Sequence, residues 1–340
     1  MKKIILALLA SGLLHFSSPA QTPGFVLIKK TVLGGEGGWD YLLADSEAKR
    51  LYVSHSTQVE VLDLDTHAKI GTISGQGIHG IAVVPGSGRG IITNGRSNTA
   101  TIFDLKTLKL VKELPTGKNP DALLYDKFSD RVFIFNHSGG TATVIDIRKA
   151  TVIGTVDLAG EGVEAGVSDD QGTIFVNMED SHEIVSFDAK TQAVKNRWKI
   201  SPGEEPTGLA IDKKTHRLFS ACHNELLMVV NSDNGKIIAQ VPIGKGVDGV
   251  VFDADLGLII TSNGEGSITI IKEFSADEFG AIKTVKTQPG ARTIALDPKT
   301  HHVFVSTAQY GEKPAATTEN PNPRPSIVPE TFMVMELGRK

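Results

Sequence analysis

Seven positions, spaced by about 40 residues, carry side chains that could do acid–base or metal chemistry. They are Asp40, His79, Asp121, Glu164, Thr207, Asp248 and Arg292, separated by 39, 42, 43, 43, 41 and 44 residues. Four acids, one imidazole and one guanidinium at a constant interval indicate a shared site, provided that the intervening segments bring them together. Crowded carboxylates raise one another's pKa, and a bound cation would relieve that repulsion.

His79 falls between Asp40 and Asp121 in this series. An imidazole with two carboxylates is a suitable ligand set for a divalent ion such as calcium, manganese or zinc. The chain has no tightly spaced motif such as HExxH or an EF-hand loop, so the ligands would come from distant segments. We therefore expect a metal at Asp40, His79 and Asp121, or alternatively a solvated polar rim.

Arg292 has two interpretations. Its guanidinium could hold a ligand carboxylate or phosphate through two parallel hydrogen bonds. Alternatively, it could form a salt bridge with Asp248 or Asp40 within the same series.

A second series keeps the same interval: His55, Asn94, Asn136, Met178, Cys222, Ser262 and Thr307, followed directly by Ser56, Gly95, His137, Glu179, His223, Asn263 and Ala308. Its histidines, His55, His137 and His223, are candidate proton-transfer groups, as is His79, with Glu164 or Glu179 as a carboxylate partner. No serine lies in a GxSxG motif, so we assign no catalytic residue.

Residues 119–160 show which elements would position these side chains. They contain four short apolar runs, 122–125, 132–135, 142–147 and 151–158, separated by turn-forming residues, which is typical of a four-stranded antiparallel meander. A meander that recurs about every 40 residues is the unit of a β-propeller. In that fold the first strand of each blade lines the central channel. Both series therefore converge on one channel opening, which we call the mouth.

Two further series carry nearly one residue type and predict structural turns. They are Asp45, Asp126, Asp169, Asp212, Asp253 and Asp297 between the first two strands, and Asp63, Asp104, Asp146, Asp188 and Asn231 between the last two. Asp and Asn side chains accept hydrogen bonds from backbone N–H groups two or three residues on, which stabilises a tight turn.

The seventh unit contains only three strands, at about 293–296, 303–306 and 331–337. Residues 25–33 have the composition of the missing outer strand and would close the ring by pairing with 331–337. We therefore predict an all-β fold, a seven-bladed β-propeller of four-stranded antiparallel blades, forming a single domain over 21–340. Residues 309–330 form a Pro-rich loop insertion in the last blade, as a lid, a partner surface or a loop lying along the blade.

Segments such as LYVSHSTQVEVLDLDTHAKIGTI (51–73) and VFIFNHSGGTATVIDIRKATVIGTV (132–156) resemble the YVTN repeat of YncE-like extracytoplasmic bacterial propellers. The resemblance covers about residues 25–340 and implies the propeller fold. It leaves the function open, because similar propellers include binding proteins, antibiotic-inactivating lyases, lactone hydrolases, cell-surface proteins and single-stranded DNA binders.

Residues 1–20 combine two lysines, an apolar run from Ile4 to Leu14 and the small residues Ser18 and Ala20, which predicts a signal peptide and a periplasmic or secreted protein. The apolar run is too short to span a bilayer, so we expect no transmembrane segment after cleavage. Cleavage removes two of the 35 basic residues and none of the 39 acids, leaving a formal charge of about −6. That charge disfavours duplex nucleic acid.

Cys222 is the only cysteine, so no intrachain disulfide can form, and we expect a buried structural thiol or a thiol near the site. No CxxCH or Walker motif occurs, and no GxGxxG follows a strand and opens a helix, which argues against covalent haem and nucleotide chemistry.

These observations favour a monomer that binds a small molecule, a metal ion or a protein partner at the mouth. The expected contact residues are Asp40, His79, Asp121, Glu164, Asp248, Arg292, His55, His137 and His223. The first alternative is a metal-assisted lyase or hydrolase at the same mouth, similar to streptogramin lyases or lactonases. The second is an interaction scaffold that uses the blade rims and residues 309–330.

Overall fold

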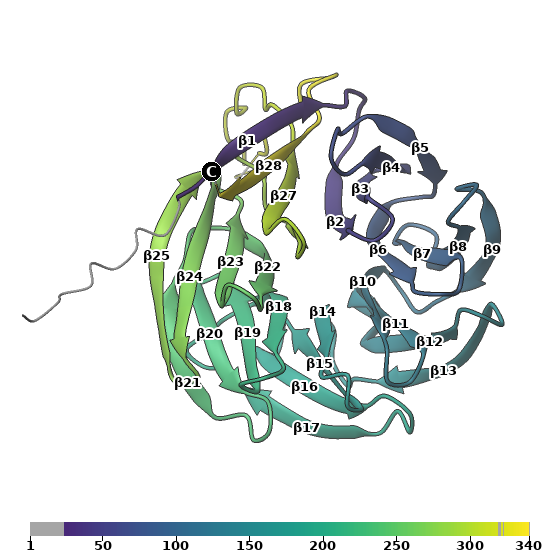
Figure 1. The fold of residues 1–340 in the computed structure, drawn as a ribbon, viewed down its shortest axis with the longest axis vertical. Coiled ribbons are helices and arrows are strands. Elements are labelled where there is room, and N and C mark those ends of the chain that lie inside the picture. Colours follow the sequence, from purple (N-terminus) through teal and green to yellow (C-terminus); the bar gives the residue numbers. More distant parts are fainter. Residues whose placement is uncertain (1–23, 319–320, 322, 340) are drawn as a thin grey trace, which may run out of the picture.

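The computed structural model describes residues 24–318, 321 and 323–339. The strands form seven four-stranded antiparallel sheets that follow one another around a ring (Figure 1). This confirms the predicted all-β, seven-bladed β-propeller. Among the described residues the helical content is a single 3-10 turn, η1 (His137–Gly139). The predicted signal peptide, residues 1–20, lies outside the described residues.

Blades one to three comprise β2 (Trp39–Asp45), β3 (Arg50–His55), β4 (Gln58–Asp63), β5 (Lys69–Ser74); β6 (Ile78–Val84), β7 (Arg89–Asn94), β8 (Thr99–Asp104), β9 (Leu110–Pro115); and β10 (Pro120–Asp126), β11 (Arg131–Asn136), β12 (Thr141–Asp146), β13 (Thr151–Asp157). Blades four to six comprise β14 (Val163–Ser168), β15 (Thr173–Met178), β16 (Glu183–Asp188), β17 (Val194–Lys199); β18 (Pro206–Asp212), β19 (Arg217–Cys222), β20 (Leu226–Asn231), β21 (Ile237–Pro242); and β22 (Val247–Asp253), β23 (Leu258–Asn263), β24 (Ser267–Ser275), β25 (Glu278–Lys286). Blade seven comprises β26 (Ala295–Asp297), β27 (His302–Thr307), β28 (Met333–Arg339) and β1 (Phe25–Val32).

The two ends of the chain close the ring, as predicted. β1 pairs antiparallel with β28 from Phe25 opposite Arg339 to Val32 opposite Met333. Figure 1 shows the two strands side by side at the closure. The strands of this blade begin later than expected, β26 at Ala295 and β28 at Met333. In blade six the second strand ends at Asn263, so the prediction of Ser262 for that position was wrong by one residue.

The core lies between neighbouring blades, which explains why the second and third strands are apolar on both faces. Phe133 of blade three contacts Phe187 of blade four, with ring centroids 5.4 Å apart. Both side chains are fully buried in one cluster with Phe135 and Val176. The outermost strands are mostly exposed, as in β9. Stability therefore depends on each blade covering the next.

The two aspartate series cap turns, as predicted. Asp126 accepts a hydrogen bond from the Ser129 N–H at 2.8 Å, and Asp104 accepts one from the Thr107 N–H at 2.7 Å. Asn231 does the same for the Asp233 N–H at 2.8 Å. These side chains therefore stabilise turns and are not candidates for a binding site.

The Pro-rich loop between β27 and β28 begins at the mouth end of β27. Tyr310 bridges Ile327 across the loop, and its ring lies 6.0 Å from the Trp39 ring of blade one. The role of the loop as a lid or partner surface stays a prediction. Within residues 24–318, 321 and 323–339, no helix has the length and apolar character needed to cross a membrane.

Candidate functional site at the channel mouth

A bulge at the same point of six blades directs the mouth residues towards the channel. The pairing between first and second strands shifts register directly after the first strand residue in blades one to six. The first residue inside each bulge is the predicted mouth residue: Asp40, His79, Asp121, Glu164, Thr207 or Asp248. Bulges re-aim side chains in this way next to functional sites.

Side chains from the second strands fix neighbouring mouth residues relative to one another. The Thr93 hydroxyl accepts the Gly80 N–H at 2.8 Å and donates to the Asp121 carbonyl of the next blade at 2.7 Å. Gly80 is needed for this close approach, because a Cβ there would lie 2.7 Å from the Asp121 carbonyl oxygen. The backbones that carry His79 and Asp121 are therefore held together by the fold.

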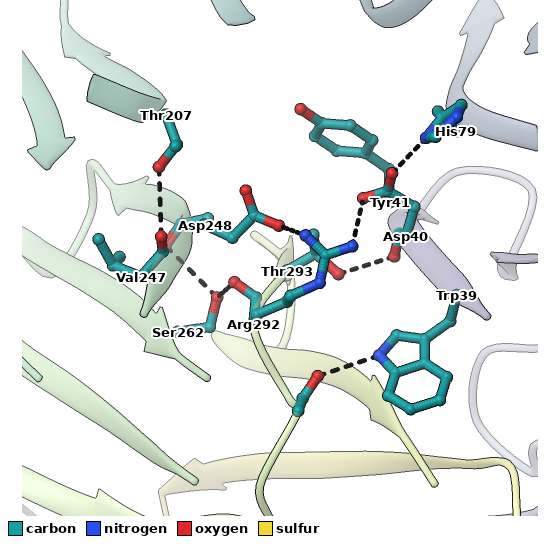
Figure 2. Close-up of polar contacts among 12 residues, drawn as sticks. Trp39, Asp40, Tyr41, His79, Thr207, Val247, Asp248, Ser262, Arg292 and Thr293 are labelled. Atoms are coloured by element: carbon teal, nitrogen blue, oxygen red, sulfur yellow. Dashed lines mark hydrogen bonds and ion pairs between the residues drawn. The ribbon is translucent and has the colours of Figure 1, made fainter. Parts of the chain in front are cut away.

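Arg292 lies between two carboxylates from different blades (Figure 2). Its Nη1 donates to Asp248 of blade six, and its Nη2 is 3.9 Å from Asp40 Oδ1 of blade one. The salt-bridge interpretation of Arg292 is therefore confirmed. One of its N–H groups is therefore already hydrogen-bonded to the protein, to Asp248.

His79 brings Asp40 together with a further carboxylate, Asp121. Its Nδ1 lies 2.5 Å from Asp40 Oδ2 and 3.0 Å from Asp121 Oδ1. The Tyr41 hydroxyl donates to the other Asp121 oxygen at 3.5 Å. One ligand atom each from Asp40, His79 and Asp121 lies within 4.8 Å of the others, so these three residues could hold a metal ion.

A second group lies across blades three to five. His137 Nδ1 is 2.9 Å from Glu164 Oε1, and His223 Nδ1 is 3.2 Å from Glu205 Oε2 and 3.7 Å from Glu179 Oε1. Glu179 belongs to two further ligand sets, one with His137 and Glu164 and one with His223 and Glu205. The predicted mouth histidines His137 and His223 therefore both meet carboxylates.

The pKa values show how closely the charges are crowded. Burial lowers the pKa of His79, but hydrogen bonds to Asp121 and Asp40 outweigh it and raise that pKa to about 10. Burial raises the pKa of Glu164 to about 8 and that of Asp248 to about 7. The hydrogen bond that His137 donates to Glu164 raises the pKa of His137 to about 9. Near neutral pH the mouth therefore holds protons that a cation could replace.

Three predicted positions do not take part in this cluster. His55 is only 3% exposed and its ring stacks on Phe332 with centroids 4.0 Å apart, so it belongs to the packing under the mouth. Thr207 is buried and donates its hydroxyl to the Val247 carbonyl at 3.3 Å. Cys222 is fully buried, and burial raises the pKa of its thiol to about 12, which supports the structural interpretation.

Sequence reasoning missed several mouth residues. A cavity of about 290 Å³ beside Asp40, His79 and Arg292 is also lined by Trp39 and Arg96. Arg96 is an exposed loop residue and carries no periodic signal. Tyr41 and Glu205 were missed as well. Tyr41 could have been found, because the corresponding residue after the mouth position is Gly or Ala in blades two to six.

Neither protein-family models nor curated proteins match this chain. Among solved structures it is similar to hydrazine synthase from Kuenenia stuttgartiensis, with a TM-score of 0.67 and 14% sequence identity. The alignment covers 82% of this chain and 94% of that one. The two chains share a fold. At this identity the likeness supports the propeller architecture and carries no activity from one protein to the other.

Proposed function

We propose that this protein is a YncE-like propeller that binds a divalent metal ion at Asp40, His79 and Asp121. The observation that carries the proposal is the convergence of these three side chains, from three successive blades, within 4.8 Å at the mouth. Two carboxylates and an imidazole suit zinc or manganese better than calcium, which takes 6–8 oxygen ligands. The ion would replace the proton that His79 shares with its neighbours.

The surrounding groups support this proposal. Asp40 is buried and its pKa is raised, chiefly by burial, although the His79 hydrogen bond opposes the shift. Asp121 is also enclosed, yet the His79 hydrogen bond keeps its pKa below the usual range against the effect of burial. Asp40 therefore keeps a raised pKa despite His79 and Arg292, and a divalent ion would add positive charge beside it.

Isothermal titration of metal-free protein with Zn²⁺, Mn²⁺ and Ca²⁺ tests the proposal. His79→Gln and Asp121→Asn should weaken zinc binding by roughly 100-fold, since even outer-shell changes cost 10–100-fold. His216→Gln is the matched control, because this exposed imidazole lies away from the mouth, 2.8 Å from Asp233 Oδ1. If no ion binds, or if the two site variants bind like the wild type, the proposal fails.

A metal-assisted lyase or hydrolase at the same mouth is the second candidate. The observation that favours it is the cavity of about 290 Å³ lined by two of the three ligands, Asp40 and His79, which is open to a small substrate. An enzyme would lose turnover in Asp121→Asn while a pure binding protein has no turnover to lose. A screen of lactone and ester substrates with and without zinc separates the two.

We further propose that the protein is exported to the periplasm or secreted, on the strength of the signal-peptide pattern in residues 1–20. Cell fractionation with N-terminal sequencing tests this directly. The expected mature chain begins at Gln21. Recovery of the full-length chain from the cytoplasm would exclude export.

A further inference from the structure

A cavity of about 320 Å³ lies between blades six and seven, on the face opposite the mouth. It is lined by residues of β1, β23, β24, β25 and β28, which Figure 1 shows adjoining one another near the C-terminus. Phe25 and Arg339 pair at the end of β1 and β28 remote from Met333, which itself pairs with Thr307 at the mouth. The cavity is therefore separate from the metal site.

The walls of this cavity are apolar. Phe25, Leu258 and Ile270 form buried wall, each no more than 3% exposed. Phe274 and Ile282 line the cavity too, yet they are 57% and 43% exposed. Large apolar side chains around a hollow indicate a ligand that covers them. The volume is at the lower end of the roughly 300–1,000 Å³ range of small-molecule sites.

The polar groups of the cavity are all cationic. Lys272 Nζ donates to the Leu256 carbonyl at 2.6 Å and Lys283 Nζ donates to the Phe25 carbonyl at 3.0 Å. No acidic residue lines the cavity, and no described carboxylate forms an ion pair with Lys272, Lys283 or Arg339. The Nε of Arg339 is buried without a hydrogen-bond partner among the described residues. Buried donors of this kind normally have an acceptor.

We propose that this cavity binds a medium-chain aliphatic carboxylate. The alkyl chain would cover Phe274 and Ile282, and the carboxylate would accept hydrogen bonds from Arg339 and the lysines. Charge complementarity selects the anion, because three cations without an acidic partner surround one apolar hollow. The planar fork of a guanidinium matches a carboxylate especially well. This inference does not depend on metal binding at the mouth.

Titration calorimetry of the metal-free mature chain with hexanoate, octanoate and decanoate tests the proposal. Each added methylene should tighten binding roughly threefold to fourfold until the cavity is full. Octan-1-ol should bind roughly tenfold more weakly than octanoate, because it lacks the charge-assisted hydrogen bonds. No octanoate binding, or equal binding of octanol, would overturn the proposal.

Variants locate the site. Arg339→Gln and Lys283→Gln should each weaken octanoate binding roughly tenfold. Phe274→Ser should weaken it through the apolar wall, without disturbing the fold because this side chain is exposed. Lys286→Gln is the matched control, since this exposed lysine lies on the same strand outside the cavity. Octanoate affinity unchanged in all three site variants would overturn the proposal.

A separate experiment tests whether the cavity binds membrane lipid instead of a free carboxylate. Vesicles of phosphatidylglycerol are sedimented with wild-type protein and with Arg339→Gln. Capture by vesicles that depends on Arg339, without binding of monomeric octanoate, would assign the cavity to membrane lipid and overturn the proposal. Octanoate binding without vesicle capture is the expected result.

Discussion

Arg292 and Asp248 form an ion pair across blades seven and six, beside the short first strand of blade seven. β26 has three residues, whereas β22 has seven. Residues 292 and 293, which precede β26, are held by side chains: the Ser262 hydroxyl donates to the Arg292 carbonyl, and the Thr293 hydroxyl donates to the Asp40 carbonyl at 2.7 Å (Figure 2). The ion pair therefore lies beside residues 292 and 293, which do not pair with β27 as the first strands of other blades pair with their second strands.

Arg292→Gln should lower the free energy of unfolding by roughly 1–3 kcal/mol, because it leaves the largely buried Asp248 carboxylate without its partner. Adding Asp248→Asn should restore most of the loss, as measured by urea denaturation of the single and double variants. Arg148→Gln is the control, since its pair with Asp130 is about half exposed and should contribute less than ~1 kcal/mol. Equal losses in the two arginine variants would contradict this role.

The stability of the metal-free protein should fall as the pH rises from about 5 to about 8, by on the order of 2 kcal/mol. Glu164, Asp248, His79 and His137 all have raised pKa values in the folded chain. Each contributes stability that is complete below its unfolded pKa and is lost as the pH rises through the folded value. Thermal melts across this range measure the slope.

Two controls sharpen this pH dependence. Glu164→Gln should flatten the profile, because the glutamine has no proton to lose. Saturating zinc should also flatten it if the ion takes the place of the protons. A profile that is level in the metal-free wild type would show that the mouth acids titrate normally.

The features that recur in every blade could be predicted from the sequence. Contacts that differ from one blade to the next could mostly not be predicted. The role of Asp104 and Asp126 in turns could be predicted, because the tight turns of the repeated blades leave backbone N–H groups that need an acceptor. Convergence of Asp40, His79 and Asp121 follows from the ring alone. Pairing between His223 and Glu205 could not be predicted, because it depends on loop conformation. His55 was misplaced, because Phe332, which stacks on it, arrives from the far end of the chain.

His55→Phe should leave zinc affinity at the mouth unchanged, because its ring packs against Phe332 beneath the surface. The His55 Nδ1 lies 3.9 Å from Glu60 Oε1, beyond hydrogen-bond distance, and that carboxylate is also held by Lys69 and Gln58, so an apolar ring should cost only about 1 kcal/mol. Phe332→Ala should cost roughly 3–5 kcal/mol through the cavity it leaves. Phe128→Ala, at a 43% exposed site, is the control. A large loss of zinc affinity in His55→Phe would return this residue to the binding site.

Cys222 should react with a thiol reagent only after unfolding. Its side chain is fully buried, its Sγ lies 3.7 Å from the Ser220 carbonyl oxygen, and burial raises the pKa of the thiol to about 12. The nucleophile is the thiolate, which is scarce at such a pKa and has no access to solvent. Ellman's reagent at pH 8 should therefore label much less than one thiol per native chain over an hour, and one per chain in guanidinium. Rapid labelling of the native protein would place Cys222 within reach of solvent and reopen the interpretation of a thiol near the site.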